Sequence, residues 1–446
     1  MLRIFVFFGL IILKVMTMTA SVNAATDFNP IQFTVDTLDN GLTVIYHIDK
    51  SAPIVSTIVH YKVGSKDENP NLTGFAHFFE HLMFESTDKI KRGEMDKLIQ
   101  LAGGNLNAHT SFDETVYKIN LPSNQLPLAL WIEGQRMRKL SVDTIGVETQ
   151  RGVIQEERKQ RMENQPYGTA FDKVCEKLFA GGSYSWTPIG SEKHINEASI
   201  DEFRTFYNNF YQPNNATLVI AGDFDIKVAA KYVEAYFGGY PKSNNIKREK
   251  FLLTPMKSEY KETIYDEKAQ LPAVFVAYPS VDLSDTNYFA LKLMGDILAS
   301  GESSRLYRRL VDKEQSAVAA EFENLNLQNS GLTLLIGIAT PGTEISTIEK
   351  QIDEEIENLI KNGVSDDELQ KAKNITEAQF VNSKKNVAEK AQELARLYSY
   401  YGDASVINTE LANFNKVTKE DITRVAKMYF ATKNRVVLTY LPKPNN

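Results

Sequence analysis

The sequence contains only one cysteine, Cys175, among its 446 residues, so an internal disulfide is excluded. That cysteine lies in the helical pattern AFDKVCEKLF, where a small buried apolar residue is expected rather than a nucleophile or a metal ligand. Positive charge is also scarce, because 57 acidic side chains outweigh 50 basic ones and give a formal net charge of −7. A nucleic-acid partner is therefore not expected, since such proteins present a basic face.

Long hydrophobic runs are absent beyond the N-terminus. Residues 1–24 have the pattern of a signal peptide, in which Arg3 precedes the apolar run 4–13 and the motif VNA forms a cleavage site. An uncleaved membrane anchor is the alternative, but Lys14 ends the run short of the ~20 residues that a span needs. We expect an exported chain with no stable membrane anchor, periplasmic or, alternatively, secreted.

The rest of the chain repeats itself. Residues 200–224 and 420–442 each combine a helix that ends in aromatic residues, a polar turn and an apolar strand. Capping-box patterns that start at Ser199 and Thr418 open the two copies. The copies lie about 220 residues apart, roughly half of the mature chain, so the sequence predicts a duplicated α+β unit.

A second pair of segments supports the duplication. The strand, loop and helix order of residues 54–84 recurs in residues 273–298. The polar stretch 241–250 is the expected linker. We therefore predict one domain over residues 25–245 and a second domain over residues 246–446.

The motif HFFEH, residues 77–81, places two of only six histidines four residues apart. On a helix, His77 and His81 share one face and can bind one zinc ion together. Glu80 lies beside them and can take a proton from a water on the metal. The HxxEH order is the inverzincin signature, although a helix that merely buries two hydrogen-bonded histidines is the alternative.

A catalytic zinc needs a third protein ligand. The helical segment 147–164 offers Glu157, which lies three residues from Ile154 and four from Val153, in the middle of an apolar stripe. A carboxylate in that place is costly unless it is paired or bound to a metal. A solvated helix face is the alternative, and it suits Glu156 better than Glu157.

Taken together, these motifs resemble the M16 (pitrilysin-like) zinc metallopeptidases, with the likeness extending over nearly the whole mature chain. His77, Glu80 and His81 are followed at family spacing by Glu157 in RGVIQEE, and the stretches GGNLNAHTSFDETVYK, YGTAFDKVCEKLF and SYSWTPIGSEKHI also match. The resemblance implies an α+β fold of the LuxS/MPP-like metallohydrolase type. Two homologous α/β halves, each an antiparallel-rich sheet flanked by helices, would form a clamshell around an unfolded peptide.

The resemblance also implies the site. One zinc ion per chain would be held by His77, His81 and Glu157, with Glu80 as general base. Family members use the segment around Asn107 and Ala108 as a sheet-edge strand that pairs with the substrate backbone, and an exposed edge can accept an extended peptide. An ordinary turn and strand is the alternative for that segment.

Two departures from the family pattern stand out. Gln150 occupies the place of a second glutamate near the third ligand, so any charge tuning from that position is lost. Single-chain active members also carry an arginine and a tyrosine seven residues apart in the second half, and here Val311 and Val318 stand there. We expect a related partner chain without HxxEH to supply the pair in a heterodimer. A non-catalytic structural or binding subunit is the alternative.

Overall fold

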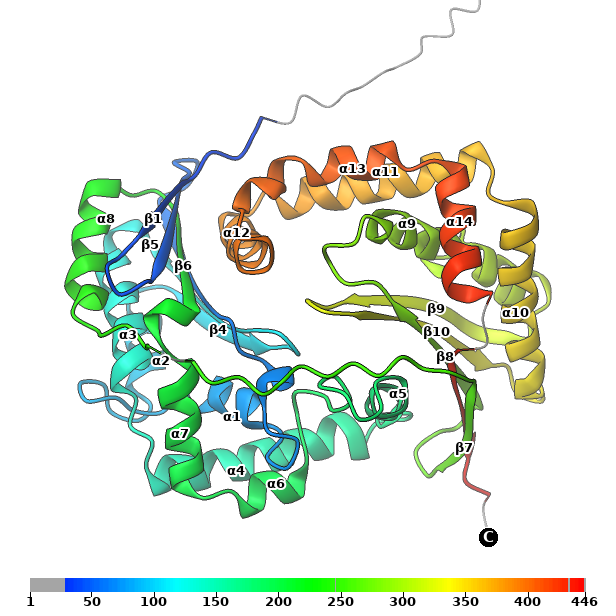
Figure 1. Cartoon of the computed structure of the whole chain (residues 1–446), viewed down its shortest axis with the longest axis horizontal. Helices are drawn as coiled ribbons and strands as arrows, with labels where there is room; N and C mark the ends of the chain where they lie inside the picture. The colour runs from blue at the N-terminus through cyan, green and yellow to red at the C-terminus, as the bar shows by residue number, and fades with distance from the viewer. Residues whose placement is uncertain (1–28, 245, 432–433, 445–446) are drawn as a thin grey trace, which may run out of the picture. The chain divides into compact units, whose positions relative to one another are not determined.

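The structure is a computed structural model that describes residues 29–444 except 245 and 432–433. The predicted signal peptide, residues 1–24, lies outside the described residues. From Gln32 onward the described chain forms one unit that contains two β-sheets (Figure 1). None of the described helices is long and apolar enough to cross a membrane.

The first sheet has six strands in the order β1-β2-β6-β3-β5-β4. Strands β2 and β6 are parallel, and the other neighbours are antiparallel. The strands are β1 (Thr34–Thr37), β2 (Thr43–Ile48), β3 (Ile54–Tyr61), β4 (Asn105–Thr110), β5 (Thr115–Pro122) and β6 (Ala216–Gly222).

The second sheet has five strands in the order β7-β11-β8-β10-β9, with only β7 and β11 parallel. Its strands are β7 (Tyr260–Asp266), β8 (Ala273–Ser280), β9 (Ala317–Asn326), β10 (Gly331–Ala339) and β11 (Val436–Pro442). These strands repeat, in order and direction, the series β2-β6-β3-β5-β4 of the first sheet. The prediction of two homologous α/β halves is therefore confirmed, and only β1 has no counterpart.

Helices flank both mixed sheets. In the first half they are α1 (Phe75–Leu82), α2 (Glu94–Leu101), α3 (Leu126–Lys139), α4 (Thr144–Arg158), α5 (Ala170–Leu178), α6 (Glu192–Glu197), α7 (Ile200–Phe210) and α8 (Ile226–Val233). In the second half they are α9 (Asn287–Ala299), α10 (Ile345–Asn362), α11 (Asp366–Ser383), α12 (Val387–Tyr401), α13 (Glu410–Lys416) and α14 (Lys419–Phe430).

One helix from each half packs on the sheet of the other half (Figure 1). Helix α5 contacts β8 and β11, and its Val174 and Cys175 are buried in one apolar cluster with Ala277 and Leu438 of those strands. Helix α12 in turn contacts β3 and β6 of the first sheet. Each half therefore covers part of the other half's sheet, which ties the halves together. Cys175 is buried, as predicted, and burial raises the pKa of its thiol.

The two-domain division stays a prediction. The described residues of the expected linker, 241–250, form no helix or strand. Residue 245, at which the division was expected, lies outside the described part of the chain.

Candidate metal centre

Helix α1 carries both histidines of the HxxEH motif, and apolar spacing fixes its orientation. Its buried aromatic and aliphatic side chains recur at helical intervals and face the first core: Phe75, Phe78, Phe79 and Leu82. The Phe78 ring lies 4.4 Å from the ring of Phe203 on α7. His77 and His81 share a different face of the helix, with ring centroids 4.9 Å apart.

The start of α1 is held by a buried carboxylate. Glu68 accepts the backbone N–H groups of Gly74 and Ala76, each at 2.8 Å, and the indole N–H of Trp186 at 3.0 Å. Burial raises the pKa of Glu68 to about 8, while the two backbone N–H groups act in the opposite direction. Gly74 has φ +98°, and a Cβ there would meet the Cδ1 atom of Ile195 at 2.8 Å, so the turn into α1 requires glycine.

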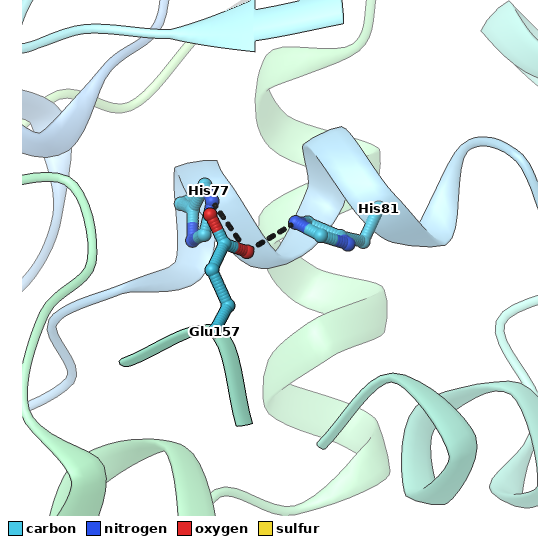
Figure 2. A group of neighbouring side chains, drawn as sticks. All are labelled: His77, His81 and Glu157. Carbon is cyan, nitrogen blue, oxygen red and sulfur yellow. Dashed lines mark ion pairs between the residues drawn. The ribbon is translucent and has the colours of Figure 1, made fainter. Parts of the chain in front are cut away.

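Glu157 on α4 meets both histidines (Figure 2). Its Oε2 atom lies 3.1 Å from His81 Nε2 and 3.6 Å from His77 Nε2, and the three candidate ligand atoms all lie within 4.8 Å of one another. Hydrogen bonds from His77 and His81 hold the pKa of Glu157 well below its usual range. Two imidazole nitrogens and one carboxylate oxygen form a donor set that suits zinc and leave a fourth position open. These three residues therefore fit the metal that the motif predicts.

The position of Glu157 was predicted for a partly wrong reason. The apolar stripe includes the buried Ile154, but Val153 is 44% exposed. Glu156 is exposed, as the alternative for a solvated face expects. Asp143 caps α4 by accepting the N–H of Gly146 at 2.8 Å, and the helix runs on into a π-helix over Lys159–Glu163.

The other carboxylate oxygen of Glu157, Oε1, pairs with an arginine one turn further along the chain. Arg161 Nη1 lies 3.0 Å from Glu157 Oε1. The carboxylate therefore directs Oε2 toward the histidines and Oε1 toward a guanidinium, an arrangement typical of a ligand oriented by a neighbouring group. The sequence analysis did not foresee this contact.

Glu80 lies on α1 next to His81 and is half-buried. No hydrogen bond between the described residues involves its carboxylate, so the group is available to a water or a substrate beside the histidines. Its role as general base stays a prediction.

Gln150 lies on α4 but hydrogen-bonds away from the histidines. Its Nε2 atom donates to Glu85 Oε1 at 2.5 Å, and Arg92 donates to the other oxygen of the same buried carboxylate. A carboxylate thus lies next to the position where the family glutamate is missing, but it comes from the loop after α1. The sequence analysis missed Glu85, because a single glutamate in a loop gives no spacing signal.

Strand β4, which contains Asn107 and Ala108, is an edge of the first sheet. Ala108 packs against the first core, whereas Asn107 is exposed and its Oδ1 atom accepts the Ala108 N–H at 2.8 Å. A peptide that pairs with this amide would have to displace the Asn107 side chain. The edge position agrees with the predicted role of the strand and does not by itself establish it.

In the second half, valines occupy the two positions where single-chain family members carry an arginine and a tyrosine, so no side chain there can donate a hydrogen bond. Val311 lies in the π-helix Tyr307–Lys313, and Val318 is 48% exposed at a bulge where β9 pairs with β10. Arg305 is engaged elsewhere, because its Nε and Nη2 atoms bind Glu368 at 2.7 and 2.8 Å.

The four remaining histidines make hydrogen bonds or ion pairs outside the HxxEH site. His47 contacts the carbonyl of Gln32 at 2.7 Å, and His194 contacts Thr73. His60 and His109 both contact Glu114, which the sequence analysis did not single out. In the described part of the chain, only His77, His81 and Glu157 form a group that could hold a metal ion.

Two models of peptidase domains match this chain. The model "Insulinase (Peptidase family M16)" matches residues 43–187, and the model "Peptidase M16 inactive domain" matches residues 197–376. The second of these models falls largely on the half that lacks HxxEH. The fold is that of M16 proteases, and the chain belongs to the M16 peptidase family.

Individual relatives agree. The chain is 29% identical over 404 residues to the zinc protease PqqE of Helicobacter pylori, covering 88% of this chain and 89% of the relative. A crystal structure of a protease from Helicobacter pylori matches with a TM-score of 0.88 at 27% identity and covers 93% of this chain and all 100% of that one. The periplasmic protease PqqL from Escherichia coli has the same fold, with a TM-score of 0.76 at 20% identity over 92% of this chain and 47% of that one.

Proposed function

We propose that this chain is a zinc-dependent metalloendopeptidase that cleaves unfolded peptides and works with a partner chain. The observation that carries the proposal is the convergence of His77, His81 and Glu157, drawn from two helices, on one point. The relative PqqE of Helicobacter pylori is also a zinc protease by name.

In this proposal each side chain has one task. His77, His81 and Glu157 would hold one zinc ion, and Arg161 pairs with the second oxygen of Glu157, so that Oε2 faces the two histidines. Zinc, when bound, would activate a water and polarise a nearby carbonyl group. The Glu80 carboxylate would accept a proton from the water whose oxygen bonds to the carbonyl carbon, and would give that proton to the amine released as the C–N bond breaks.

The peptide would be oriented by backbone pairing with the free edge of β4. Main-chain hydrogen bonds at such an edge give affinity for any extended chain with little dependence on its side chains. That mode suits an unfolded peptide, whose N–H and C=O groups are available. Asn107 would leave the Ala108 N–H and turn to the scissile carbonyl region.

We further propose a heterodimer. Val311 and Val318 cannot stabilise a developing negative charge, so the donors must come from elsewhere. The match to PqqL covers less than half of that protein, so a second chain of similar size would complete an assembly of the same extent. Because α5 and α12 tie the two halves of this chain together, we place the reaction chamber between this chain and a related partner that lacks HxxEH.

Export is part of the same proposal. The signal-peptide pattern of residues 1–24 supports it, and the similar PqqL of Escherichia coli is a periplasmic protease, which agrees with a periplasmic site of action. Secretion into the medium is the alternative. Fractionation of cells that express the tagged chain, with N-terminal sequencing of the product, tests both the compartment and cleavage after Ala24.

Hydrolysis of an unfolded peptide tests the peptidase proposal. The zinc-loaded chain is assayed alone and with the product of a related reading frame that lacks HxxEH and carries the arginine and tyrosine. Glu80→Gln should lower kcat about 1,000-fold while zinc content is unchanged. Glu148→Gln, on the exposed face of α4, is the matched control and should keep full activity.

The alternative is a non-catalytic binding subunit of the same fold, which the absent donors at Val311 and Val318 favour. It predicts a zinc-loaded complex that binds peptide without turnover. In that case Glu80→Gln would change nothing measurable.

A further inference from the structure

A buried acidic residue connects the edge strand β4 to the second half of the chain. His60 on β3 and His109 on β4 both pair with Val116 on β5, so they lie in one row on the same face of the sheet. Glu114 precedes Val116 by two residues, which directs it to that face as well. This face is covered by α12, a helix of the second half.

Glu114 interacts with a group from each of three elements. Its Oε2 atom lies 2.6 Å from His60 Nε2, and its Oε1 atom lies 3.5 Å from His109 Nε2. Burial and the nearby negative charge of Glu114 raise the pKa of the Tyr400 hydroxyl on α12. The rings of Tyr400 and His60 also make an edge contact with centroids 6.3 Å apart. Burial alone would raise the pKa of Glu114, but His60 and His109 hold it well below its usual range.

The residue before Glu114 makes a second link to the second half. Asp113 Oδ2 accepts the backbone N–H of Gln328 at 2.8 Å, in the turn between β9 and β10. Its Oδ1 atom accepts the Tyr184 hydroxyl at 2.7 Å, and that hydroxyl accepts the N–H of Asn329 at 3.2 Å. The β4–β5 turn is therefore fixed to the second half through two consecutive acidic side chains.

We propose that Glu114 is a positioning residue through which the second half, by way of Tyr400, holds β4 in place for a substrate peptide. The inference rests on the proposed function, in which the peptide pairs with β4. An edge strand is paired on one side only, so it frays more easily than an inner strand. Binding a peptide to a strand that is already ordered avoids the entropy cost of ordering it.

This inference assigns a task to the half that carries no metal ligands. Its helix α12 and its β9–β10 turn set the position of the strand on which the substrate would lie, whereas the chemistry belongs to α1 and α4. Tyr400 lies outside the metal centre, so it acts through Glu114 and through the His60 ring that it contacts.

The variant Tyr400→Phe tests the inference because it removes one hydroxyl and leaves the packing of the ring. Tyr401→Phe is the matched control, since the neighbouring hydroxyl on the same helix donates at 2.6 Å to the carbonyl of Leu283, away from β4. Amide hydrogen exchange is measured on the full zinc-loaded chain. Tyr400→Phe should speed exchange at residues 105–110 about ten-fold, the order expected when a polar group beside a buried charge is lost, with α1 unchanged.

Kinetics with the partner present supply a second readout. Tyr400→Phe should raise KM about three- to ten-fold while kcat stays within about two-fold and zinc content is constant. Asp113→Asn should shift exchange at β4 in the same direction, and it serves if Tyr400→Phe folds poorly. A purely structural contact would lower the melting temperature without this selective loss of protection.

The outcomes separate the two claims. If exchange at β4 is the same in Tyr400→Phe and Tyr401→Phe, the positioning role is wrong even if the enzyme cleaves peptide. If the wild-type complex cleaves nothing, the proposed function is wrong, and the exchange measurement still decides whether the second half holds β4.

Discussion

The two halves share one strand order but use the space between their first helix and their edge strand differently. Leu218 and Val437 lie equally far beyond the helix caps Ser199 and Thr418, so they mark equivalent strand positions. From each of these two residues, a row of residues paired across neighbouring strands runs to the edge strand of its sheet. In the first sheet the row is Leu218–Val59–Tyr117–Ala108, which ends on β4. In the second sheet it is Val437–Val276–Leu335–Phe322, which ends on β9.

The two rows end in side chains of very different size, Ala108 and Phe322, and this size determines how much space is left beside the first helix of each half. Ala108 contributes one methyl group beside α1, the helix of the two histidines. Phe322 instead fills the corresponding space beside α9, so closely that a Cβ on Gly295 would meet its ring at 1.8 Å. The helix α9 faces the core with Ala290, Met294 and other apolar side chains. One scaffold therefore supports a polar triad in one copy and a packed core in the other.

The largest expected effect concerns the third ligand. Glu157→Gln should lower zinc affinity by more than about 100-fold, because an amide is a poor zinc ligand and even the loss of a supporting contact costs up to that much. Zinc affinity is measured by competition with a chelator. Glu156→Gln is the control, since its exposed side chain contacts neither histidine.

The equivalent change in the second half sharpens the comparison. Gln379 lies as far beyond the α11 cap Ser365 as Glu157 lies beyond the α4 cap Asp143. Gln379→Glu should leave the zinc content at one ion per chain, because α9 offers no histidines. A second bound ion would mean that the two copies differ less than the structure indicates.

Removal of the ring that fills the second half should cost stability. Phe322→Ala should lower the free energy of unfolding by about 3 kcal/mol, the lower end for such a truncation because the ring is only half-buried. Urea denaturation measures the change. Val318→Ala on the same strand, with its exposed side chain, should stay within about 0.5 kcal/mol of wild type. Equal losses in the two variants would contradict the packing role of Phe322.

Restoring the family glutamate should be unfavourable in this chain. Gln150→Glu places a second carboxylate against the buried Glu85, which loses a hydrogen-bond donor and gains a like charge, at a cost of about 2 kcal/mol at pH 7. The neighbouring charge raises the pKa of the new carboxyl group, so the loss should shrink as pH falls toward about 4.3, below which the group is protonated in both the folded and the unfolded chain. Gln155→Glu, which bonds Asn196 at the surface, is the control. An unchanged unfolding free energy at pH 7 would show that Arg92 neutralises both carboxylates.

A smaller effect tests an ion pair that belongs to the second half alone. Hydrogen bonds from Arg305 lower the pKa of Glu368 to about 2. A lowered folded-state pKa stabilises the protein above the unfolded-state pKa of about 4.3, and this contribution is lost as pH falls toward 2.

Glu368→Gln should therefore destabilise the chain by about 1 kcal/mol at pH 7, a value reduced for partial exposure, and by almost nothing near pH 2. Urea titrations at several pH values follow the difference. The exposed Glu357→Gln is the control and should show no such window. A difference that stays constant with pH would assign the effect of Glu368 to the α11 cap rather than to its charge.

Much of the site could be predicted because it depends on short-range spacing. His77, Glu80 and His81 are fixed relative to one another by one helical turn, and that helix was predicted correctly. The duplicated topology was also predictable, because strand and cap patterns recur at constant distance. Glu157 lies beside the two histidines, but it was predicted through an apolar stripe that the exposed Val153 contradicts.

The remainder depends on contacts between distant segments. Nothing in the local pattern around Glu114 or Tyr400 predicts that they meet, because they are brought together by α12 crossing to the first sheet. The bond between Gln150 and Glu85 likewise joins a helix to a loop far away in sequence. Such pairings follow from tertiary packing, which a single sequence does not encode in any periodicity.

The most direct test of the metal centre is the position of zinc itself. Crystals of the zinc-loaded chain, with diffraction data collected at the zinc absorption edge, should show one anomalous peak within about 2.0–2.2 Å of His77 Nε2, His81 Nε2 and Glu157 Oε2. A fully zinc-loaded crystal with no peak between these atoms, or with its only peak elsewhere on the chain, would contradict the account.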